Sequence, residues 1–66
     1  MTRHEQHAEI ERAAREVWGK DVVGQVIVGR GHVAIYAVGG IQTLLHIEHE
    51  ALAVSAALAA LRVLNI

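Results

Sequence analysis

The sequence predicts a small α+β domain in the order helix, three-stranded antiparallel meander, helix. Two observations lead to this fold. Apolar residues recur at helical spacing near both ends of the chain, and short β-branched runs separated by glycines occupy the middle. Because domains rarely have fewer than about 50 residues, a chain of 66 residues is expected to form a single domain over residues 1–66.

The first helix has a clear start and a clear stop. Thr2 and Glu5 have capping-box spacing, in which the hydroxyl accepts a backbone hydrogen bond and the carboxylate reaches back to the cap. Glu11 and Arg15 can pair one turn apart, and Gly19 is a natural helix end. An apolar stripe at helical spacing is formed by Ile10, Ala13, Ala14 and Val17.

The middle of the chain predicts three strands, over residues 22–28, 32–38 and 41–47. Gly39 and Gly40 suit a two-residue hairpin turn, which needs positive φ. Such a turn places His46 opposite Val33. Both faces of the sheet are then substantially apolar, so we expect cover on each side. Neither outer strand contains proline, and we expect one of them to pair with a symmetry mate or to be covered.

The final segment, from about residue 49 to residue 64, predicts a helix that is apolar on all sides. A transmembrane helix needs about 20 apolar residues, and this run is shorter. One helix and three strands cannot surround it, and small folds often gain stability by oligomerisation. We therefore expect a homodimer or higher oligomer. The residues expected at its interface are Val54, Leu58, Leu61, Trp18 and Tyr36.

Composition narrows the possible partners and compartments. Cysteine is absent, which excludes disulfides and thiolate metal sites. Six basic and seven acidic residues are interspersed and give a net charge of −1, whereas nucleic-acid binding requires a basic patch. Residues 2–7 are too polar for a signal peptide. We therefore expect a cytoplasmic protein with neither a nucleic-acid nor a membrane partner.

One run resembles a dinucleotide-binding fingerprint. Gly29, Gly31 and Ala34 have the spacing GxGxxA after an apolar strand. That chemistry requires the glycine turn to open a helix whose N-terminus holds the pyrophosphate. The residues that follow alternate like a strand instead, so we predict a hairpin turn and no nucleotide cofactor.

The five histidines suggest a metal site, although no cofactor is predicted. His4 and His7 lie one helical turn apart, and the weak candidates near the last helix are His46, His49 and Glu50. Histidine with a nearby carboxylate can bind zinc or nickel. Both groups are one residue short of a metalloprotease motif. Solvated polar side chains near helix starts are the simpler interpretation.

The N-terminal part of the chain resembles the head–tail joining protein W of lambda-type phages. The resemblance covers residues 1–40 and consists of the opening Met1, Thr2 and Arg3, an alanine-bearing first helix, the pair Gly19 and Lys20, and a following hairpin and helix. It implies a virion connector. The chain departs from that pattern in its third predicted strand and in its apolar final helix.

These observations favour a binding protein over an enzyme, because no nucleophile or base is placed where a pocket is expected. The function that we expect is a non-catalytic protein-binding module, acting as a homo-oligomer that occupies a partner protein's surface. Small inhibitors, adaptors and phage or mobile-element accessory proteins are of this kind. The alternatives are a phage structural subunit such as a head–tail connector, and a histidine-based metal-binding protein.

Overall fold

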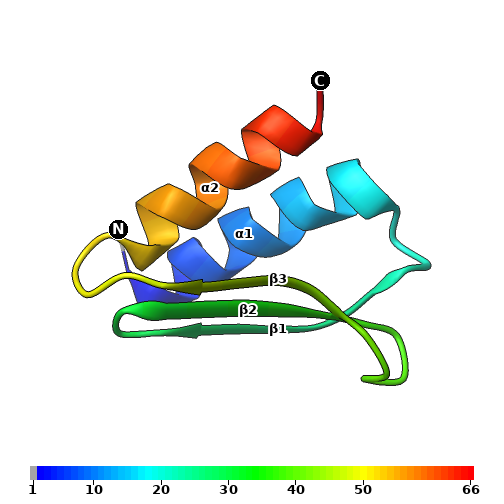
Figure 1. Ribbon diagram of the computed structural model, residues 1–66, viewed down its shortest axis with the longest axis horizontal. Coiled ribbons are helices and arrows are strands. Elements are labelled where there is room, and N and C mark those ends of the chain that lie inside the picture. Colours follow the sequence, from blue (N-terminus) through cyan, green and yellow to red (C-terminus); the bar gives the residue numbers. More distant parts are fainter. Residues whose placement is uncertain (1) are drawn as a thin grey trace.

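A computed structural model describes residues 2–66. The chain forms two layers, a three-stranded sheet and a pair of helices that lie on one face of the sheet (Figure 1). The strand order is β1-β2-β3, and both pairings are antiparallel. Helix α1 lies over β1, and α2 lies over β2 and β3. The predicted α+β fold is confirmed. Its elements are α1 (Arg3–Trp18), β1 (Val23–Gly29), β2 (His32–Ala37), β3 (Thr43–Glu48) and α2 (Ala53–Leu64).

Helix α1 forms as its sequence predicts. The Thr2 hydroxyl accepts from the Glu5 amide at 3.1 Å, and the Thr2 amide donates to Glu5 Oε1 at 2.9 Å, which completes the capping box. These hydrogen bonds, first that from the Thr2 backbone, hold the pKa of Glu5 below its ordinary value of 4.5. Arg15 and Glu11 pair at 3.6 Å. Gly19 ends the helix with a φ of 95°.

The fingerprint-like glycines lie in the hairpin that joins β1 to β2. Gly29 pairs with His32, which leaves Arg30 and Gly31 as the two loop residues. Gly31 has a φ of 74°, the sign required at the second position of a type II turn. A strand follows this turn and not a helix, so the dinucleotide-binding geometry does not form.

The register of β3 differs from the prediction. Residues 38–42 form the connection, which is longer than two glycines, and a bulge interrupts the pairing between Ile35 and Tyr36. Over most of β3 the register therefore moves by one residue. His46 lies opposite Ala34, whereas the predicted turn placed it opposite Val33. Because side chains alternate along a strand, this shift puts His46 on the sheet face away from the helices.

Helix α2 begins later than predicted, at Ala53. The preceding residues form a turn, in which the His49 amide donates to the Gly31 carbonyl at 3.1 Å and the Leu52 amide donates to the His49 carbonyl at 2.9 Å. Leu52 is the N-cap and provides no side-chain hydrogen bond. The hydrogen bond to Gly31 fixes this segment against the β1–β2 turn, so the helix starts only beyond it.

The core lies between the helix layer and one face of the sheet. Both helices cover this same face, so no helix of the described residues, 2–66, lies on the opposite face of the sheet (Figure 1). The expected cover on both sides is therefore not provided within residues 2–66. The buried core residues are Ile10, Ala14, Val23, Val26, Val33, Ile35, Ala53, Ala57 and Leu61.

Candidate functional site

The two edge strands of the sheet, β1 and β3, differ in their contacts with the helices. On β1, the His7 ring nitrogen Nε2 donates to the Val26 carbonyl at 2.9 Å and so joins α1 to this strand. Val23 and Val26 are only 5% and 7% exposed. Within residues 2–66 this is the single hydrogen bond from a helix side chain to a strand. Helix α1 therefore engages the β1 edge at one backbone carbonyl, that of Val26.

The β3 edge is open. Leu45 and Ile47 point to the core face, because they pair with the buried Ile35 and Val33 of β2. Both nevertheless remain half-buried, as does Leu44. The described residues place no strand beyond β3. The core is therefore less completely covered at this edge than at β1.

The two sides of α2 differ in a related way. Leu58 is half-buried and lines a hollow with residues of α1. Leu52 and Val63 lie on the other side of the helix by its 3.6-residue period, and they are 54% and 67% exposed. Since α1 covers β1 and α2 covers β2 and β3, the side of α2 that faces away from α1 lies above the open edge of β3.

The five residues expected at an interface lie in different places. Leu61 is 1% exposed and belongs to the core of the single chain. Val54 and Leu58 are half-buried and pack against that core, as does Trp18 at the end of α1. Tyr36 is half-buried and pairs with Thr43 on β3. They do not form one continuous surface, because they come from both layers of the domain.

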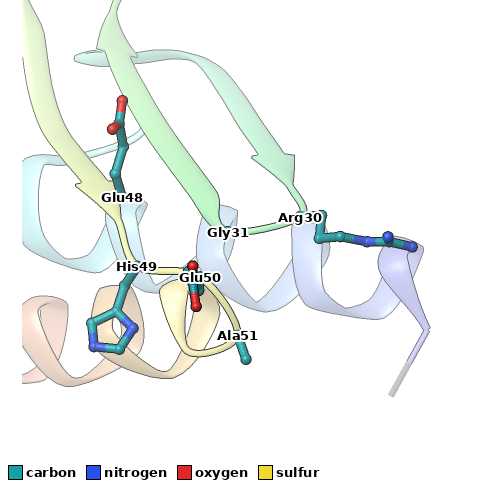
Figure 2. A pocket seen from close by; sticks show the side chains of 6 residues that line it. All are labelled: Arg30, Gly31, Glu48, His49, Glu50 and Ala51. Carbon is teal, nitrogen blue, oxygen red and sulfur yellow. The ribbon is translucent and has the colours of Figure 1, made fainter.

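Figure 2 shows a shallow hollow where the β1–β2 turn meets the segment before α2. Two of the weak metal candidates, His49 and Glu50, line it and are exposed. Glu48 is directed away from His49 in this view. The hollow is lined by Arg30, Gly31, Glu48, His49, Glu50 and Ala51.

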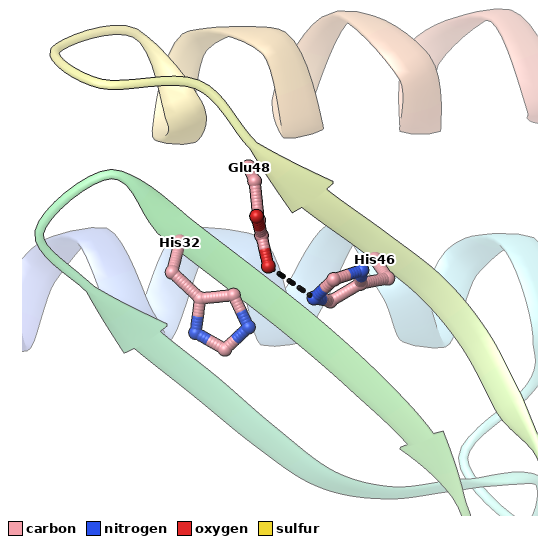
Figure 3. Close-up of side chains that lie close together, drawn as sticks. All are labelled: His32, His46 and Glu48. Carbon is pink, nitrogen blue, oxygen red and sulfur yellow. Dashed lines mark ion pairs between the residues drawn. The ribbon is translucent and has the colours of Figure 1, made fainter.

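The third weak candidate, His46, lies in a different cluster, on the open face of the sheet. Its Nε2 atom is 3.4 Å from Glu48 Oε1, and its ring centroid is 5.0 Å from that of His32, with the rings inclined by 71°. Figure 3 shows the Glu48 carboxylate directed at the His46 ring, with the His32 ring beside it. One ligand atom from each residue lies within 4.8 Å of the others.

Sequence patterns alone missed His32. It is distant from His46 along the chain, and only the pairing of His32 with Glu48 across the β2–β3 ladder brings the three residues together. The expected grouping of His46 with His49 and Glu50 does not form, because His49 and Glu50 follow the end of β3 in the loop.

Comparison with known protein families, with curated proteins and with solved structures gives no match. Neither helix in residues 2–66 is long and apolar enough to cross a membrane. The resemblance to phage protein W therefore stays a hypothesis, and Met1, which forms part of it, lies outside the described residues.

Proposed function

We propose that the protein is a cytoplasmic, non-catalytic protein-binding module that acts as a homodimer, formed through the open edge of β3 and the exposed side of α2. The observation that carries the proposal is the coincidence of these two unpartnered features on one flank. Leu52 and Val63 are exposed on α2, and the β3 edge with half-buried core residues lies beneath them.

The dimensions of the two features match. A strand of six residues spans about 20 Å, and a helix of twelve residues spans about 18 Å. A two-fold axis can pair β3 with its symmetry mate and pack α2 against its symmetry mate at the same time. The small side chain of Ala56, between Leu52 and Val63 on this side of α2, allows the helices to approach closely.

A second copy is the occupant that fits this flank, because an edge strand presents a row of amides and carbonyls with which another strand can pair along its whole length. The same contact would cover Leu45 and Ile47, which the single chain leaves half-buried. The alternative edge, β1, is already engaged by His7.

The dimer would have one continuous six-stranded sheet with four helices on one face. Its open face would be free for a partner protein, and Tyr36 on that face is a candidate anchor, since tyrosine is enriched at binding hot spots. The roles of inhibitor, adaptor, phage accessory protein or head–tail connector stay hypotheses about which partner is bound.

Sedimentation equilibrium of Val63→Asp tests the proposal. A charge buried without a partner in the interface is expected to weaken dimerisation about 100-fold or more. The chain should stay folded, as measured by circular dichroism, because the core residue Leu61 lies on the opposite side of α2. The matched control is Ile41→Asp, the same type of change at a residue that is 91% exposed in the loop before β3.

The wild type and Ile41→Asp should associate equally, and Val63→Asp should be a folded monomer. A wild type that is monomeric at the highest concentration measured contradicts the proposal. So does a Val63→Asp variant that associates as strongly as the wild type.

A further inference from the structure

We propose that His32, His46 and Glu48 form a binding site for a divalent transition-metal ion of the zinc class. The three side chains project from neighbouring strands on the open face of the sheet (Figure 3). None of them takes part in the core. The site is independent of the proposed dimer, because one chain supplies all three ligands.

The spacing of the ligand atoms fits a metal ion. Two ligands that each lie about 2.0–2.2 Å from zinc, at the tetrahedral angle, are about 3.3–3.6 Å apart. The His46 Nε2 and Glu48 Oε1 atoms are 3.4 Å apart. The third ligand atom, from the half-buried His32, lies within 4.8 Å of both. His46 and Glu48 are exposed, so rotation of their side chains can close this distance.

The backbone of the sheet places the three ligands. His32 and Glu48 are directly opposite each other in the β2–β3 pairing, and His46 is two residues before Glu48 on the same strand. Residues at these positions share one face and are neighbours within it. The site is therefore built on two paired strands, which are more rigid than a loop.

The residue between the two histidines leaves room for them. Ala34 lies opposite His46 and two positions after His32. It is completely buried although it is outside the core cluster and no helix lies on its face. The small side chain of Ala34 therefore leaves the space above it to its larger neighbours on the same face, which include His32 and His46.

The donor set selects the class of ion. Imidazole nitrogen suits zinc, copper, nickel and iron, whereas magnesium and calcium prefer an all-oxygen shell. Three protein ligands leave at least one coordination position open. Because the side chains of His46 and Glu48 are 47% and 73% exposed, an ion can reach the site from solvent without any opening of the fold.

Isothermal titration of tag-free protein with zinc chloride tests the site. We expect one zinc ion per chain, and we expect no competition from magnesium at the same concentration. The variants His32→Gln, His46→Gln and Glu48→Gln should each weaken zinc binding at least tenfold. Their circular dichroism should match the wild type, because all three side chains lie outside the core.

The matched control is His49→Gln, the neighbour of Glu48 that lies in the loop hollow, and it should bind zinc like the wild type. Val63→Asp should also bind zinc normally, so failure of the dimer and failure of the metal site are distinguishable. Absence of zinc binding overturns the proposal. Binding that survives His32→Gln and Glu48→Gln overturns it too, as does binding that is lost only in His49→Gln.

Discussion

Each of the two flanks of this domain consists of one helix and one edge strand, α1 with β1 and α2 with β3. The two flanks differ in how completely the helix covers the strand. On the α1–β1 flank, the His7 side chain reaches from the helix to the Val26 carbonyl, and the valines beneath are buried. On the α2–β3 flank, Leu45 and Ile47 stay half-buried and Val63 is exposed. Among residues 2–66, the two-layer packing therefore gives one flank whose strand edge is contacted by a helix side chain, the closed flank, and one flank without such a hydrogen bond, the open flank.

The difference follows from the side chains that each helix carries. Helix α1 has a polar residue, His7, positioned above its strand, and its other polar residues are exposed or half-buried. Helix α2 offers alanine, leucine and valine on nearly every side. An apolar helix cannot satisfy the backbone groups of an edge strand, so the open flank is the one at which we expect a second molecule to bind.

The largest effect on stability is expected at Gly31, where the β1–β2 turn contacts the segment between β3 and α2. A Cβ atom on Gly31 would lie 2.7 Å from the Glu50 carbonyl oxygen, and the residue has a φ of 74°. Gly31→Ala should therefore reduce the free energy of unfolding by about 2–4 kcal/mol, from the strained backbone and the contact together. Urea denaturation measures this loss.

The control for Gly31→Ala is Gly40→Ala. Gly40 has a similar φ of 69°, but a Cβ atom there would contact nothing within 4 Å. This variant should lose only the backbone cost of about 1–2 kcal/mol. Equal losses in the two variants would mean that the contact with Glu50 does not hold the segment before α2.

On the closed flank, removal of the His7 side chain should have an intermediate effect. His7→Ala deletes the hydrogen bond to Val26 and should reduce the free energy of unfolding by about 0.5–1.5 kcal/mol. Hydrogen exchange of the β1 amides should accelerate more than that of the β2 amides. His4→Ala, a change at an exposed residue of the same helix, should stay within about 0.5 kcal/mol of the wild type.

The smallest effect is expected at the start of α1, where Glu5 completes the capping box. Folding lowers the pKa of Glu5, so its contribution to stability is present above the ordinary value of 4.5 and is lost as the pH falls through the folded value. Glu5→Gln should therefore flatten the decline of stability in this acid range. Glu16→Gln, at the other end of α1, should leave the decline as steep as in the wild type.

The sequence predicted the parts of the fold that depend on neighbours along the chain. The capping box at Thr2, the stop at Gly19 and the hairpin at Gly31 were all readable, because each depends on a few consecutive residues and their preferred φ angles. The count and order of helices and strands followed from the same local patterns.

The register of β3 was not readable in this way. Gly39 and Gly40 both adopt positive φ, as expected, but the connection takes in residues 38–42 and a bulge follows it. A change of one residue reverses the face of every side chain on a strand. For that reason His46, which was expected opposite Val33, lies opposite Ala34 instead, on the open face beside His32.

The sequence by itself determined the number and order of the helices and strands, and the excess of apolar surface on the last helix. Only the tertiary structure decided which side of that helix is covered: it buries Leu61 within the chain and leaves Leu52 and Val63 exposed. It also brought His32 to His46 and Glu48. The physical reason is that local patterns fix φ and periodicity, whereas contacts between distant residues depend on register and on which faces of the layers meet.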